Sequence, residues 1–173
     1  MKKKILIVSI SLFLITNCNV RKNVSISEPK FSIENCLEQN LKDSTLMTGW
    51  YYVADSGFVR QWAKTDDVYY INPRPIITAE DIIKLEIKEN RWHELIFMQF
   101  GKRGTATWQE ATKEAIGNNL AFIVNDTLLA TPMVHNQITN GISIFSRIDY
   151  SKSEMEEIIK AIEKNKSDMI KPL

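Results

Sequence analysis

Cysteine and histidine are scarce in this chain, which has two of each among its 173 residues. Two cysteines cannot hold together a disulfide-stapled miniature fold, and here they form no CxxC pair for a metal. The histidines, His93 and His135, lie too far apart for an HxxxH spacing, and the chain has no GxSxG elbow and no HExxH motif. We therefore expect no metal, no cofactor, no small-molecule substrate and no catalytic residues, so that the protein is not an enzyme.

An excess of either charge is also missing. Lys and Arg number 22 against 21 Asp and Glu, which gives a net charge of +1. This balance gives no reason to expect a nucleic-acid partner or electrostatic adhesion to a membrane. The hydrophobic share of 44% and the charged share of 25% are those of an ordinary globular protein.

No long hydrophobic run is present, although the N-terminus carries a short one. Three lysines at positions 2–4 precede an apolar run over residues 5–15. This run is too short for a hydrocarbon core, which needs ~20 apolar residues. A basic start followed by a short apolar run is typical of a secretory signal peptide, which we place at residues 1–17.

Cys18 comes directly after this segment. Residues 14–18, LITNC, resemble a bacterial lipobox, in which the cysteine becomes the lipidated first residue of the mature protein. We therefore expect membrane lipid attached through Cys18 and a location in the bacterial cell envelope, on the periplasmic face or the cell surface. Asn17 departs from the small residue usual before the cysteine, so ordinary secretion and an uncleaved anchor remain alternatives.

Polar, aperiodic sequence follows the cysteine. We interpret residues 18–48 as the lipidated cysteine and a flexible tether, with a short helical turn at 33–41 and an unpaired thiol at Cys36. The folded domain is expected at residues 49–165, and a C-terminal tail at 166–173.

Strand patterns fill the first half of this domain. Aromatic and β-branched residues predict two or three strands within residues 49–73, separated by turns at 55–57 and 66–67. After a capped helical turn at 78–81, apolar residues at 83, 85 and 87 alternate with charged ones. This alternation predicts a strand with one buried and one solvent-exposed face. Residues 95–100 are apolar at nearly every position, so this strand should lie in the middle of a sheet and be covered on both faces.

Helical and strand patterns alternate in the second half. Residues 106–116 have helical spacing, with a capping box at Thr107 and Glu110 and with Gly117 placed to end the helix. A hairpin is predicted at 120–124 and 127–133, and another strand at 141–148. A last helix starts at Ser151, with Glu154 completing a capping box. The order predicts an α+β fold in which two helices pack on a largely antiparallel sheet.

Four short motifs in this region resemble the head part of the first periplasmic domain of SecD, a protein-export subunit. Residues 75–82 are similar to the family's entry segment, 112–126 to its helix and "LAIVLDG" strand, 128–132 to its second strand, and 138–141 to its "I-T-x-G" loop. The chain departs from the family in three places. Asn125-Asp126-Thr127 replaces the Asp-Gly turn, Thr131 interrupts the Ala-Pro step, and the strand after Gly141 lacks the family's later glycine. The chain also carries none of the family's transmembrane helices, so we expect a detached, SecD-head-like module on a lipid anchor.

The resemblance implies a non-enzymatic module that binds polypeptide. Its expected partners are emerging unfolded chains or proteins of the export and envelope-assembly machinery. The polar loop after the hairpin is the candidate contact surface, and its residues are Val134, His135, Asn136, Gln137 and Asn140. An alternative is an inhibitor or immunity-type lipoprotein that caps one specific partner.

Overall fold

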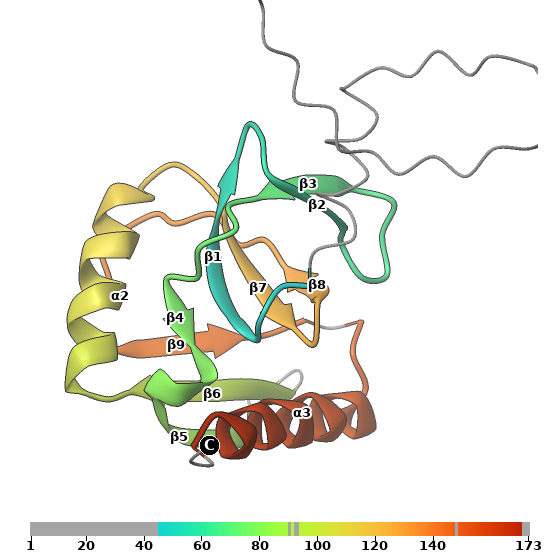
Figure 1. Ribbon diagram of the computed structural model, residues 1–173. Helices are drawn as coiled ribbons and strands as arrows, with labels where there is room; N and C mark the ends of the chain where they lie inside the picture. The colour runs from blue at the N-terminus through green and yellow to red at the C-terminus, as the bar shows by residue number, and fades with distance from the viewer. Residues whose placement is uncertain (1–44, 90, 92–93, 148, 171–173) are drawn as a thin grey trace, which may run out of the picture. The chain divides into compact units, whose positions relative to one another are not determined.

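The computed structural model describes residues 45–89, 91, 94–147 and 149–170, whose elements are shown in Figure 1. The strands are β1 (Gly49–Ala54), β2 (Phe58–Gln61), β3 (Val68–Ile71), β4 (Ile77–Thr78), β5 (Ile82–Glu89), β6 (Glu94–Phe100), β7 (Leu120–Val124), β8 (Thr127–Ala130) and β9 (Ile142–Phe145). The helices are η1 (Ala79–Asp81), α2 (Lys102–Glu114) and α3 (Lys152–Ile170). Antiparallel sheets with two packed helices confirm the predicted α+β class. Within the described ranges, no helix is long and apolar enough to cross a membrane.

The larger sheet curls until its two edge strands meet. Its strand order is β2-β3-β1-β7-β8, with β4 paired to β1, and each of these pairings is antiparallel. Just after β2, Trp62 forms a parallel bridge with Leu128 of β8, and the Ala63 amide donates to the Leu128 carbonyl at 2.8 Å. Backbone hydrogen bonding therefore joins the two edge strands at this seam.

The β7–β8 turn adds an ion pair to the seam. Oδ1 of Asp126 accepts hydrogen bonds from Arg60 Nε at 2.9 Å and from the Leu46 amide at 2.7 Å. The Arg60 side chain is only 10% exposed. Both turn residues, Asn125 (φ 46°) and Asp126 (φ 66°), have left-handed backbone, which confirms the tight turn predicted between the twisted strands.

A small apolar core lies within the curled sheet. Its buried members are Leu46, Tyr51, Ile71, Ala121, Ile123 and Leu128. Leu46 and Thr48 are buried, so residues that we expected in the tether belong to the folded domain. Cys18, Cys36 and the helical turn expected at 33–41 lie outside the described residues.

The smaller sheet has the order β5-β6-β9, and both of its pairings are antiparallel. β6 is its central strand, as predicted, but the expectation of cover on both faces is wrong. Ile96, Met98 and Phe100 are buried on one face, whereas Leu95 and Phe97 on the other face keep partial exposure. Apolar residues on both faces therefore do not mean that both faces are covered.

β5 departs from strict alternation at its start. A register shift between Ile82 and Lys84 in the pairing with β6 places Ile82 in the core and leaves Ile83 63% exposed. The prediction that Ile83 lies on the buried face is therefore wrong, because an irregularity in the ladder changes which residues share a face.

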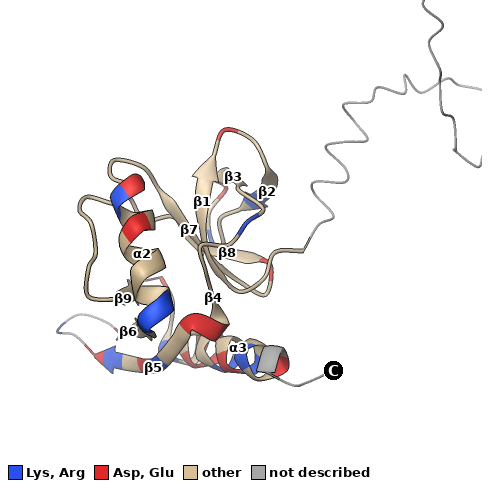
Figure 2. Cartoon of the chain, turned by 60° about the vertical axis from the view of Figure 1, so that its left-hand side comes forward, with Lys and Arg blue, Asp and Glu red and all other residues tan. Residues whose placement is uncertain are grey.

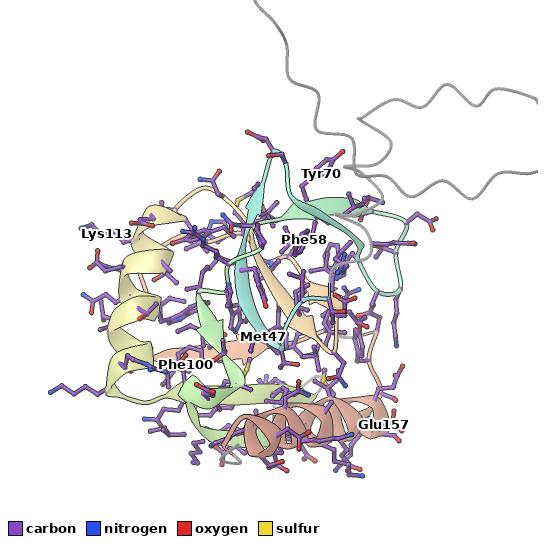
Figure 3. The ribbon with its side chains drawn as sticks, in the orientation of Figure 1. Met47, Phe58, Tyr70, Phe100, Lys113 and Glu157 are labelled. Atoms are coloured by element: carbon purple, nitrogen blue, oxygen red, sulfur yellow. The ribbon has the colours of Figure 1, made fainter. Side chains whose placement is uncertain are left out.

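The main core lies between the two sheets and the helices. It is rich in aromatic rings: Trp50 packs against Phe122 at 4.8 Å between ring centroids, and Phe100 against Trp108 at 5.5 Å. In Figure 3 Phe100 lies between α2 and the sheets, whereas Lys113 is on the outer face of α2. Phe122 of β7 also packs against Phe145 of β9 at 5.5 Å between ring centroids, and this contact joins the larger sheet to the smaller one.

Both helices pack an apolar face on the core, but their ends differ from the prediction. α2 begins at Lys102, directly after β6, and Thr107 lies inside it with its hydroxyl donating to the Arg103 carbonyl at 3.2 Å. The capping box at Thr107 is therefore wrong, while the box at Ser151 and Glu154 is confirmed. α3 continues to Ile170, past residue 165 where we ended the folded domain.

Candidate functional site

A pocket of about 430 Å³ lies where the chain leaves β8 and passes the outer edge of β9. One wall is the segment from Pro132 to Val134, and the other is the strand from Ile142 to Ile144. Trp50, Trp108 and Leu120 line the pocket on the core side, and His135, Asn136, Ile138 and Asn140 complete the lining. The lining is therefore mainly apolar, with a few polar groups from one loop.

Two tryptophans of the pocket are held by the core. The Trp50 and Trp108 rings lie 5.2 Å apart, and Trp108 Nε1 donates to the Ile142 carbonyl at 3.2 Å. This bond ties α2 to β9 and fixes one end of the pocket. Nε1 of Trp50 is buried and has no hydrogen-bond partner among the described residues.

Gly141 determines how β9 passes α2. Its φ of +65° is left-handed, and a Cβ at this position would lie 2.1 Å from Thr105 Oγ1. Only glycine accommodates both the conformation and the close approach. The family-like "I-T-x-G" segment therefore has a structural reason, because it brings the chain against α2 immediately before β9 begins.

A second pocket, of about 470 Å³, continues along the same side of the domain. It shares Pro132 with the first pocket, and it is otherwise lined by Trp62, Ala130, Thr131, Ser146, Arg147 and Asp149. We call the two pockets together the β9 groove, with residues 130–134 on one side and 142–147 on the other. The hydroxyl of Thr131 is buried and has no partner among the described residues.

Large apolar side chains are exposed at the rim of this groove. Met133 is 52% exposed and Ile144 is 51% exposed, on opposite walls. No Asp, Glu, Lys or Arg occurs between Asp126 and Arg147, so that the whole first pocket lacks a formal charge. In Figure 2 the charged residues are carried mainly by the helices and β5, while β7 and β9 are uncharged. This uncharged stretch is the signal from which the groove could have been found in the sequence.

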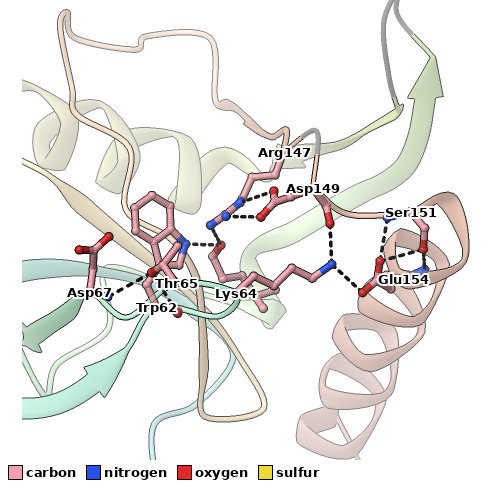
Figure 4. Close-up of polar contacts among 9 residues, drawn as sticks. Trp62, Lys64, Thr65, Asp67, Arg147, Asp149, Ser151 and Glu154 are labelled. Atoms are coloured by element: carbon pink, nitrogen blue, oxygen red, sulfur yellow. Dashed lines mark hydrogen bonds and ion pairs between the residues drawn. The ribbon is translucent and has the colours of Figure 1, made fainter.

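An ionic network closes the far end of the groove (Figure 4). The Arg147 guanidinium pairs with Asp149 and lies 4.5 Å from the Trp62 ring, and Arg147 Nη1 donates to the Leu129 carbonyl at 3.2 Å. The hydrogen bond from Arg147 lowers the pKa of Asp149. The positive charge of Arg147 is thus balanced by the carboxylate of Asp149.

The network continues to the start of α3. Lys64 Nζ pairs with Glu154 Oε1 at 2.7 Å, and the Ser151 amide donates to Glu154 Oε2 at 2.8 Å. The Lys64 contact, followed by the Ser151 bonds, lowers the pKa of Glu154 to about 2. These contacts link the loop after β2 to α3, so their role is structural.

Four of the five predicted contact residues line the groove, and three of these four are exposed. His135, Asn136 and Asn140 are exposed and border the first pocket. Val134 lines the pocket but is only 8% exposed, because its side chain packs into the main core. Gln137 turns toward α2 and donates from Nε2 to the Gln109 carbonyl at 3.2 Å. The role of this loop in partner contact stays a prediction.

Among the described residues that line the β9 groove, the titratable side chains are His135, Arg147 and Asp149. In the part of the chain that the structure describes, no three His, Cys, Asp or Glu side chains gather to hold a metal. The burial of Tyr52 and its bond to Glu114 raise the pKa of Tyr52 to about 12, but this residue faces a different pocket, beside α2. What the β9 groove offers is apolar surface beside the edge of a strand.

Comparisons with known proteins agree with this architecture. The family model of the SecDF P1 head subdomain matches residues 56–154. A crystal structure of SecDF in a super-membrane-facing form superimposes with a TM-score of 0.57 at 14% identity, covering 79% of this chain and 21% of that chain. A structure of SecDF, a membrane component that enhances protein export, gives a TM-score of 0.56 at 15% identity and covers 79% of this chain and 71% of that one. At these identities the likeness establishes the fold, and the search of curated proteins finds no match.

Proposed function

The chain belongs to the SecDF P1 head subdomain family, and from this premise we propose that it is a non-enzymatic module of the cell envelope that binds unfolded polypeptide. The observation that carries the proposal is the β9 groove, which combines exposed Met133 and Ile144 with a first pocket free of formal charge. Exposed apolar surface of this kind is typical of a site that binds another chain.

The anchor forms the second part of the proposal. Lipid attached at Cys18 would hold the domain at a bacterial membrane, with the segment before residue 45 as the tether. The domain would then be positioned to meet polypeptides during export or envelope assembly. Protein export is the process named for the SecDF membrane component.

Binding of a permanently unfolded protein tests the proposal. We would label a reduced and alkylated secretory protein, titrate it with the full chain in detergent, and follow fluorescence anisotropy. The same protein in its folded form serves as the competitor. We expect the unfolded form to bind and the folded form not to compete. A module that caps one partner would ignore the unfolded protein, and that result would overturn the proposal.

Charge introduced at the rim locates the site. Ile144→Asp places a carboxylate beside the apolar groove, and we expect affinity to fall at least about tenfold, because a carboxylate buried without a partner loses hydration. Val68→Asp is the matched control, since Val68 is 57% exposed on β3 and lines neither groove pocket. Equal loss in both variants would place binding elsewhere.

A further inference from the structure

The hydrogen-bond pattern of β9 leaves the backbone amide and carbonyl of one residue available to an additional strand. The Phe100 amide donates to the Gly141 carbonyl at 2.8 Å, and Met98 and Ile96 lie opposite Ser143 and Phe145. In an antiparallel ladder, hydrogen-bonded pairs alternate with non-bonded ones, so Ser143 and Phe145 also bond to β6. The amide and carbonyl groups of Ile142 and Ile144 therefore point away from β6, toward the free edge of the sheet.

Contacts at Ile142 agree with this alternation. Its amide donates to Asn140 Oδ1 at 3.1 Å, and its carbonyl accepts from Trp108 Nε1 at 3.2 Å. Both outward groups of Ile142 are thus occupied within the domain. Ile144 has no such contact among the described residues, so its amide and carbonyl remain available.

The opposite wall of the groove does not supply the missing partners. The Pro132 carbonyl accepts from the Leu120 amide at 3.0 Å, the Val134 amide donates to Asn118 at 2.9 Å, and proline has no amide hydrogen. At Pro132 and Val134 the backbone of this wall is therefore satisfied by the core of the domain. A strand lying in the groove would bond to β9 through Ile144.

Charge determines what kind of segment fits beside Ile144. The first pocket has no charged residue in its lining, and the Arg147 guanidinium in the second is paired with Asp149. A charged side chain on the guest would lose hydration without gaining a partner. An uncharged extended segment matches the groove, since alternate side chains of a strand face the same side.

Resting on the proposed function, we propose that the bound polypeptide joins the smaller sheet as an additional strand beside β9. The amide and carbonyl of Ile144 exchange hydrogen bonds with its backbone, and its alternate apolar side chains enter the first pocket. The ligand class is an extended, uncharged segment with apolar residues at every second position. Affinity then comes from the backbone and selectivity from the pocket.

Backbone methylation of a peptide tests strand addition directly. The probe is a capped, fluorescent decapeptide in which Val and Ser alternate, titrated against the full chain. Two analogues carry N-methyl groups on all Val amides or on all Ser amides. In a strand these two sets of amides point to opposite edges. We expect one analogue to bind at least about tenfold more weakly than the other, since each lost backbone bond lowers affinity.

A proline at Ile144 supplies the matching change in the protein. Ile144→Pro removes an amide that β6 does not use, and proline is tolerated on edge strands. Ile144→Ala is the control, because it shortens the side chain but keeps the amide. We expect Ile144→Pro to weaken binding of the unmodified peptide at least about fivefold more than Ile144→Ala does. Circular dichroism verifies the fold of both variants.

The outcomes separate strand addition from polypeptide binding as such. The proposal is supported if the two methylated peptides lose affinity unequally. Which set of methylated amides, Val or Ser, weakens binding more then reports the direction of the bound strand. Equal binding of both overturns it, and so does binding of the unfolded protein without binding of the unmodified peptide. If neither the unfolded protein nor the peptide binds, the proposed function itself fails. The peptide pair is measured on the unaltered chain, so the test holds even if Ile144→Pro does not fold.

Discussion

Replacing Asp126 with glycine tests how the curled sheet is closed. Turn preferences alone favour the change, because Asp126 has a φ of 66° and left-handed backbone costs a non-glycine residue ~1 kcal/mol. The SecD-like turn also has glycine where this chain has Asp126. The structure predicts the opposite effect, since Asp126 Oδ1 binds Arg60 and the Leu46 amide across the seam.

The magnitude follows from the exposure of the two partners. Breaking a fully buried ion pair costs roughly 3–5 kcal/mol, but the Asp126 side chain is 38% exposed and that of Arg60 is 10% exposed. We therefore expect a loss of roughly 3 kcal/mol, offset by ~1 kcal/mol from the relaxed turn. The net destabilisation is about 2 kcal/mol, which lowers the melting temperature by roughly 8 °C for a domain of this size.

Urea unfolding followed by circular dichroism measures this difference. Asp126→Asn is the matched control, because asparagine tolerates the turn and keeps a hydrogen-bond acceptor while losing the charge. We expect this variant to lose about 1 kcal/mol of unfolding free energy. In an Arg60→Met background, Asp126→Gly should lower the free energy of unfolding by less, because the ion pair is already absent. The account would be contradicted if Asp126→Gly were as stable as the original chain or more stable. The relaxed turn would then contribute more to stability than the Asp126 contacts across the seam.

Three further predictions follow from other contacts. Gly141→Ala should destabilise the domain by more than about 2 kcal/mol in the same urea assay, because the Cβ would meet Thr105 at 2.1 Å in a left-handed backbone; a neutral result would contradict the packing of β9 on α2. The pKa of Glu154 is depressed to about 2, so its contribution to stability is present above pH ~4.5 and is lost as the pH falls toward 2; Glu154→Gln should flatten this acid dependence, and an unchanged slope would contradict the Lys64 contact. Cys18→Ala should abolish incorporation of radiolabelled palmitate in cells, and labelling that persists would exclude lipidation at Cys18.

Local patterns predicted the elements better than their pairing. The hairpin turn at Asn125 and Asp126 and the capping box at Ser151 were correct, because each depends on residues that are close in sequence. The curled sheet was not predicted, since the contact of Trp62 with Leu128 joins segments that no short window contains. The start of α2 was also missed, because glycine at Gly101 caps the helix without a side-chain signal.

The groove could be predicted only in part. The loop around His135 was selected for its polarity, and it does border the first pocket. Ile144 was not selected, because a strand pattern does not reveal whether a strand lies at an edge or which of its amides face outward. The absence of charge between Asp126 and Arg147 marked the region in the sequence, but only the fold brings its two halves together as walls of one groove.

Binding of a permanently unfolded secretory protein to the full chain, compared between Ile144→Asp and Val68→Asp, tests the central claim most directly. The account predicts that the original chain and Val68→Asp bind alike and that Ile144→Asp binds at least about tenfold more weakly. If the unfolded protein does not bind the original chain, or if the two variants lose affinity equally, the β9 groove is not a polypeptide-binding site.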